Sequence, residues 1–258
     1  LYRDAARLEP GDGASHFRLG VAYRHRHDSP DRRPGDFQKA IDHWSRALEI
    51  DPNDYIGRRR IQQYGPRQDK PYPFYDWVET AREEIRARGE SPLPLALEPG
   101  GAETAPPAGA LSPTAAPEGE PDPDGRIHRD RRPFIRVETT VVPETRPDGL
   151  AARIHVEFRP NEAISAHWNN EAEDLVLWVA PPPGWTVERR LLTVPNPPDP
   201  VSREVRRIEF EALGPPGRGP GTFPAYALYY VCEDVDGTCL YRRQDIPVKI
   251  EPGALGTP

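Results

Sequence analysis

The hydrophobic pattern of the chain changes its period at a proline-rich stretch, and this change divides the sequence into two structural classes. Residues 91–132 hold nine of the 34 prolines, with many Ala and Gly residues and few large apolar ones. Before this stretch apolar residues recur at helical spacing, whereas from Phe134 they alternate with polar residues. We expect a helical region at 1–90, an extended linker, a β-domain at 133–252 and a tail at 253–258. Such a linker would leave the orientation of the two domains free.

The C-terminal part predicts an antiparallel β-sandwich of the immunoglobulin type. About seven short segments with strand-like alternation are separated by Pro/Gly turns, a rhythm typical of such sandwiches. The expected strands start at Ile135 and at Ala152 and then cover Leu175–Ala180, Thr186–Val194, Arg207–Leu213, Ala225–Cys232 and Leu240–Ile250. The fold class is therefore a helical domain joined to an all-β domain.

In the helical region, an aromatic residue followed by Ala and then Pro recurs with an offset of 42 residues. The pattern resembles the tetratricopeptide repeat, with Leu-Gly-x-x-Tyr in a first helix and Ala-x3-aromatic-x2-Ala-x4-Pro in a second. The resemblance implies a packing surface made of Leu19, Gly20, Tyr23, Ala40, Trp44, Ala47 and Pro52. That repeat runs 34 residues, so this copy carries about eight extra, which fall in an enlarged loop between His25 and Gly35.

Two further helices are expected after the repeat, at Tyr55–Tyr64 and at Asp76–Gly89. The first copy lacks its first helix, and the chain contains no Met. We interpret the sequence as part of a longer protein. Helical pairs of this kind bind partner proteins on a concave face, or act as spacers that pack against neighbouring domains; both interpretations stay open here.

The only two cysteines, Cys232 and Cys239, flank a turn-forming sequence at residues 234–237 (Asp-Val-Asp-Gly). Strand-forming residues lie on both sides. A turn centred on Val235 and Asp236 places the two cysteines opposite each other across a hairpin. Opposed residues at a non-hydrogen-bonded pair have close Cβ atoms, within reach of a disulfide.

This hairpin, with Tyr-Tyr-x-Cys on one arm and Gly-x-Cys on the other, is similar to the N-terminal domain of the DsbD family of thiol:disulfide interchange proteins. It also resembles disulfide bond corrector domains. The order of repeat, Pro-rich linker and sandwich resembles the rear part of multidomain bacterial redoxin proteins. The resemblance implies that Cys232 and Cys239 exchange a disulfide with a thioredoxin-fold partner, that Tyr230 and Tyr241 shield the pair, and that no cofactor is needed.

Three interpretations of the cysteine pair remain open: redox exchange, a structural bridge, and two free thiols. A structural bridge closing so short a loop would contribute about 2–3 kcal/mol in the loop-entropy model. The neighbouring acids Glu233, Asp234 and Asp236 would raise the thiol pKa, so an exchanging pair would serve as the disulfide under attack. Oxidised cysteines would favour a periplasmic or extracytoplasmic location, and a cytoplasmic one stays open.

Other classes of function receive little support from the sequence. The formal charge of −7 and the absence of a basic excess in either half argue against nucleic-acid binding. No catalytic site independent of the cysteines, no metal-ligand motif and no membrane-spanning apolar run is found. The polar run at 167–171 would form a loop or line a site. A carbohydrate- or surface-binding sandwich would require Trp168 and Trp185 to be exposed.

Overall fold

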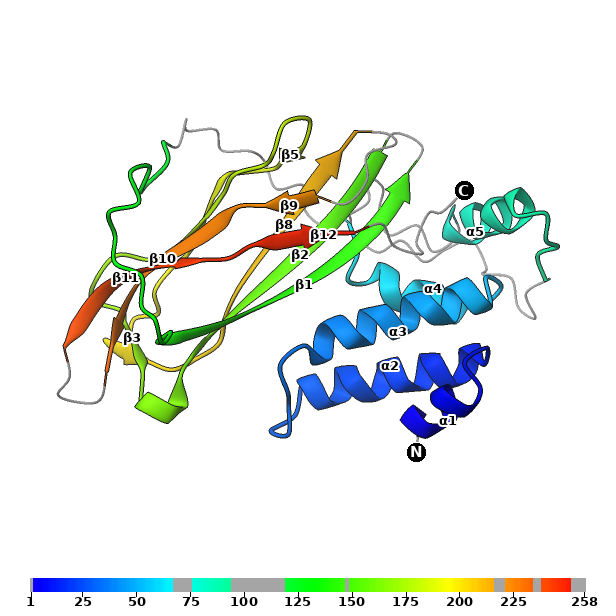
Figure 1. Cartoon of the computed structure of the whole chain (residues 1–258), viewed down its shortest axis with the longest axis horizontal. Helices are drawn as coiled ribbons and strands as arrows, with labels where there is room; N and C mark the ends of the chain where they lie inside the picture. Colours follow the sequence, from blue (N-terminus) through cyan, green and yellow to red (C-terminus); the bar gives the residue numbers. More distant parts are fainter. Residues whose placement is uncertain are drawn as a thin grey trace.

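The computed structural model describes residues 2–66, 76–93, 119–146, 149–215, 221–233 and 238–251. Helices come first and pack beside a β-sandwich formed by the strands that follow (Figure 1). The helices are α1 (Tyr2–Leu8), α2 (Gly13–His27), α3 (Asp36–Ile50), α4 (Tyr55–Gln62) and α5 (Asp76–Ala87). The change of hydrophobic period therefore correctly predicts a helical part followed by a β-part.

The helices α2 and α3 form a closely packed antiparallel hairpin (Figure 1). Asp12 caps α2, since its carboxylate accepts hydrogen bonds from the backbone N–H groups of Ala14 and Ser15. Gly20 lies against the indole of Trp44, which is 1% exposed. The expected packing surface is mostly buried, with Tyr23 half-buried: Leu19, Gly20, Tyr23, Ala40, Trp44, Ala47 and Pro52.

Replacing Gly20 with alanine should lower the free energy of unfolding by about 1–2 kcal/mol. A Cβ atom at this position would lie 2.5 Å from Cδ1 and Nε1 of Trp44, so the indole must move out of its packed position. The gain in helix propensity, about 1 kcal/mol, offsets part of this cost. Urea unfolding followed by circular dichroism measures the change. Gly11→Ala is the matched control, because its Cβ would meet no atom within 4 Å; an equal effect of both substitutions would contradict the prediction.

Two sheets face each other in the β-part. The first has the order β1 (Ile135–Arg146), β2 (Gly149–Pro160), β8 (Arg206–Gly214), β5 (Thr186–Val187). The second has the order β6 (Leu191–Val194), β4 (Leu175–Val179), β10 (Ala225–Cys232), β3 (His167–Asn169), β7 (Val201–Ser202), and β11 (Cys239–Asp245) pairs with the other edge of β10. The strands β9 (Gly221–Phe223) and β12 (Val248–Ile250) pair with each other, and a 3-10 turn covers Glu162–Ile164.

Two expected strands are each divided in the structure. The segment Thr186–Val194 contributes β5 to one sheet and β6 to the other, because the chain crosses between the sheets. The segment Leu240–Ile250 breaks at Pro247, which lacks the N–H group needed to continue a ladder. The polar run at 167–171 begins with a strand, β3, and is not wholly a loop.

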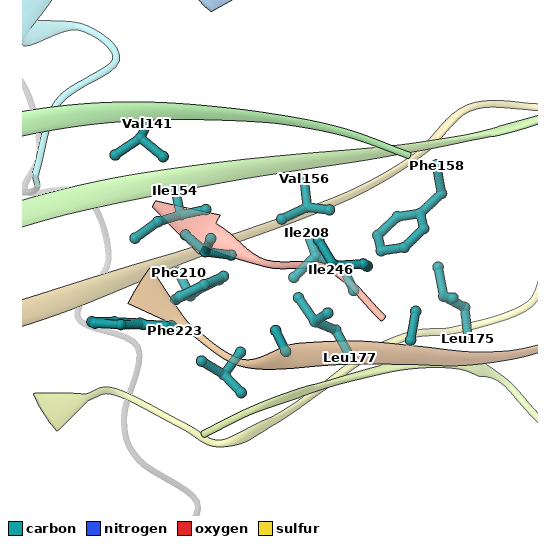
Figure 2. Packing of buried hydrophobic residues seen from close by; sticks show 14 of the residues in the cluster. Val141, Ile154, Val156, Phe158, Leu175, Leu177, Ile208, Phe210, Phe223 and Ile246 are labelled. Atoms are coloured by element: carbon teal, nitrogen blue, oxygen red, sulfur yellow. The ribbon is translucent and has the colours of Figure 1, made fainter. Parts of the chain in front are cut away.

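The core of the sandwich lies between the two sheets, where alternate residues of each strand point inward (Figure 2). Phe158 and Phe210 come from one sheet, Leu177 comes from the other, and all three are completely buried. Trp168 and Trp185 are 0% and 5% exposed. A carbohydrate- or surface-binding role that depends on these two indoles is therefore wrong.

The helical part packs on the outer face of the first sheet, so the expectation of a free orientation between the domains is wrong. Val142 of β1 is fully buried in a cluster with Phe37, Ile41 and Trp44 of α3. The side-chain amide of Gln38 donates to the carbonyl of Val141 at 3.3 Å and accepts from its N–H at 2.9 Å. These contacts fix α3 along the free edge of β1.

The enlarged loop between α2 and α3 supplies the polar half of this interface. The guanidinium of Arg32 lies 2.7 Å from the carboxylate of Glu138, which also accepts from the N–H of Gly35 at 2.8 Å. His27 and Arg32 both reach Glu157 of β2, each at 3.4 Å. The extra residues of the loop therefore dock the helices on the sheet.

Part of the expected linker is also packed. Within residues 119–132, the described end of the stretch at 91–132, Asp122 binds Arg243 at 2.8 Å and Asp130 binds Arg242 at 2.7 Å. Residues 94–118 and the tail at 253–258 lie outside the described residues. The described segment 119–132 thus packs against β11 of the sandwich.

Candidate functional site

The two cysteines are paired directly across the hairpin of β10 and β11 and form a disulfide. Their Cα atoms are 4.0 Å apart, the close spacing of a non-hydrogen-bonded antiparallel pair. The predicted opposition of Cys232 and Cys239 is confirmed, and the interpretation as two free thiols is not supported. The turn at 234–237 lies outside the described residues.

The two ends of this disulfide differ in their exposure. Cys232 lies on β10, which has neighbours on both sides, and is 3% exposed. Cys239 lies on β11 at the edge of the sheet and is exposed. A thiolate from solvent or from another protein therefore reaches the sulfur of Cys239 far more readily than that of Cys232.

Two tyrosines stand next to the disulfide on the outer face of the sheet. Tyr230 and Tyr241 are paired across the same hairpin, and their rings stack with centroids 4.4 Å apart. A hydrogen bond that the Tyr230 hydroxyl donates to the Glu173 carboxylate raises the pKa of Tyr230 to about 12. The stacked rings form an uncharged surface two residues along the hairpin from the disulfide, and their shielding of the pair stays a prediction.

On the other side of β10, His167 of β3 lies directly opposite Cys232. Opposed residues share a face, so His167, Cys232 and Cys239 form a row across three neighbouring strands. His167 is 5% exposed. In the sequence His167 stands in a polar run, and nothing there links β3 to β10.

The charges near the site are acidic. Glu233 follows Cys232 and is exposed, and Glu173 holds Tyr230. Asp234 and Asp236 lie outside the described residues. A nearby carboxylate disfavours a thiolate, so the reduced cysteines would be weak nucleophiles in this environment.

The described part of the chain gives little support for other kinds of site. No three His, Cys, Asp or Glu side chains gather there in a way that could hold a metal ion. No described helix is both long enough and apolar enough to cross a membrane. The disulfide hairpin is the place where a reactive group, an exposed edge and an aromatic surface come together.

Comparisons with known proteins add no assignment. Neither a family model nor a curated protein matches the sequence. Among solved structures, the GAE domain of yeast GGA1 matches 46% of this chain and 96% of that domain, at 16% identity and a TM-score of 0.24. A TM-score this low carries no argument about fold or function.

Proposed function

We propose that the protein is a thiol–disulfide exchange module in which Cys232 and Cys239 form the redox pair and the helices act as its scaffold. The observation that carries this proposal is the position of the disulfide. It bridges an edge strand to an inner strand and exposes one of its cysteines. A purely structural staple has no need of an exposed end beside an aromatic surface.

In the proposed reaction, a thiolate of the partner protein attacks the sulfur of Cys239. A bond forms between these two sulfurs, the Cys232–Cys239 bond breaks, and Cys232 leaves as a thiolate. The partner's second cysteine then attacks its own sulfur in the mixed disulfide, which releases Cys239 and leaves the partner oxidised. The net result is a reduced pair here and a disulfide in the partner.

The finer assignments belong to the same proposal. The α2–α3 hairpin, with Gly20 against Trp44, supports a helical pair of the tetratricopeptide type. The two facing sheets support an immunoglobulin-like sandwich, and its cysteine hairpin supports a relation to the DsbD-like domains. On this basis the partner is a thioredoxin-fold domain, the whole protein is of the redoxin type, and its location is periplasmic or extracytoplasmic.

The reduction potential of the Cys232–Cys239 pair tests this function. We expect a value of about −180 to −270 mV, the range of thioredoxin-type exchange proteins, measured by thiol trapping and mass spectrometry in graded dithiol buffers. Variants that lack both cysteines serve as the blank for the trapping reagent. A potential below about −300 mV would mark a structural bridge and contradict the proposal.

A second candidate function is a protein-binding module whose disulfide is only structural. It is favoured by a hollow of about 520 Å³ between α3, β1 and β12. Asp42 and Glu49 of α3 and Lys249 of β12 line this hollow together with apolar residues. The mixed lining suits a peptide, and the low potential described above would favour this alternative.

A further inference from the structure

We infer that the partner adds a short strand to the open edge of β11, which brings its cysteine into line with the disulfide. This inference rests on the proposed exchange function and specifies how the partner is recognised. Among the described strands, β11 pairs only with β10 and leaves its other edge outside the sheet. An extended segment that pairs with such an edge gains main-chain hydrogen bonds without a preformed pocket.

The direction of the backbone groups on this edge follows from the register. Cys239, Tyr241 and Arg243 alternate along β11, and the 4.0 Å Cα spacing makes the Cys232–Cys239 pair a non-hydrogen-bonded one. The N–H and C=O groups of these alternate residues therefore point away from β10. The N–H of Arg243 donates to the carbonyl of His128 at 3.0 Å, in agreement with this direction.

The segment 119–132 already occupies half of the edge. It reaches Arg242, Arg243 and Asp245 through the carbonyl of His128 and the charged groups of Arg129 and Asp130.

In the described chain no backbone group forms a hydrogen bond with the outer edge of β11 at Cys239 or Tyr241. The carbonyl of Tyr241 accepts one hydrogen bond there, from the guanidinium of Arg242. The half that stays open is the half that carries the disulfide.

A strand added there would place a cysteine opposite Cys239 on the same face of the sheet. The partner's sulfur, Cys239 and Cys232 would then lie in a row across three strands, which matches the in-line approach needed to displace Cys232. The partner residue two positions away would lie opposite Tyr241, a residue that is 37% exposed and whose ring stacks on Tyr230. The recognised segment is thus an extended stretch with a cysteine and an apolar residue two positions away.

A nonapeptide with one central cysteine and Val at positions −2 and +2 tests the inference on the whole protein. We expect it to reduce the disulfide at least about tenfold faster than glutathione at equal thiolate concentration, since strand hydrogen bonds hold it in place. N-methylation at both −2 and +2 blocks the N–H group opposite Tyr241 whichever way the peptide runs along β11, and it should abolish this advantage. N-methylation at −1 and +1 blocks outward N–H groups and should leave most of it.

Two variants of the protein test the same interaction by changing β11 in place of the peptide. Tyr241→Pro removes the outward N–H group, whereas Tyr241→Val removes the ring and keeps the N–H. We expect Tyr241→Pro to lose the peptide's advantage over glutathione and Tyr241→Val to keep part of it, where the advantage is the ratio of the two rates measured on the same variant. Equal rates for the two N-methylated peptides would overturn strand addition while exchange itself stands. If no thiol reduces the disulfide, the proposed function fails and the inference falls with it.

Discussion

Replacing Glu157 with alanine should release the helices from the sandwich and lower the free energy of unfolding by about 3 kcal/mol. The Glu157 side chain is 9% exposed and lies 2.7 Å from Arg159, 2.9 Å from Arg207 and 3.4 Å from both Arg32 and His27. Alanine would leave the basic side chains around position 157 without the carboxylate that they share. The loop between α2 and α3 would then lose its main anchor on β2.

The same cluster should make the docked state sensitive to acid. Burial raises the pKa of Glu157, but hydrogen bonds from His27 and Arg207, with Arg159 nearby, outweigh it and hold the pKa well below its ordinary 4.5. A hydrogen bond to His155 lowers the pKa of Glu209 to about 2. A carboxylate with a lowered pKa stabilises the fold above its unfolded pKa, so this contribution is lost as the pH falls from about 4.5 towards 2.

Urea unfolding at several pH values, combined with hydrogen exchange of α2 and α3, measures both effects. In Glu157→Ala the exchange protection of the helices should fall at neutral pH, and the further loss on acidification should be smaller than in the wild type. Glu144→Ala is the matched control, because Glu144 lies on the neighbouring strand and pairs with Arg146 within that strand. Equal losses in the two variants, or helices that stay protected in Glu157→Ala, would show that this cluster does not hold the interface.

Local features of the sequence explain which parts of the fold are predictable. The helical and strand periods follow from neighbouring residues, and the spacing of Cys232 and Cys239 across a turn sets their opposition within a single hairpin. The opposition of the two cysteines could therefore be located from sequence, whereas Tyr230 and Tyr241 come from the resemblance and their stacking is not predicted.

Docking of the helices depends on pairs such as Arg32 and Glu138, which are 106 positions apart. The alternation of His155 and Glu157 with apolar residues in β2 has the same form whether water or a helix covers that face. The position of His167 beside Cys232 depends on the pairing of β3 with β10, which the order of strands along the chain does not reveal. The enlarged loop expected between His25 and Gly35 supplies Arg32 and Gly35 to this interface, but its composition predicts only a break between two helices.

Single-cysteine variants should show a strong asymmetry between the two ends of the disulfide. In Cys232→Ser, the remaining Cys239 is exposed on an edge strand and should form a mixed disulfide rapidly with glutathione disulfide. In Cys239→Ser, the remaining Cys232 is 3% exposed on an inner strand and should react at least about tenfold more slowly, since its sulfur becomes accessible only when the hairpin opens.

Each variant is the control for the other, because both lose the same cross-link. Their free energies of unfolding should fall by a similar amount, about 2–3 kcal/mol, so unequal stability cannot explain unequal reactivity. Mass spectrometry at timed intervals gives the two rates. Cys232→Ser should also retain, as a trapped mixed disulfide, a thioredoxin-fold partner that lacks its second cysteine and is supplied as its glutathione mixed disulfide: Cys239 attacks the partner's sulfur, glutathione leaves, and neither chain then has a second thiol to resolve the product. If Cys232 reacted as fast as Cys239, attack would not enter from the edge of the sheet, and both the proposed direction of exchange and the added strand would be wrong.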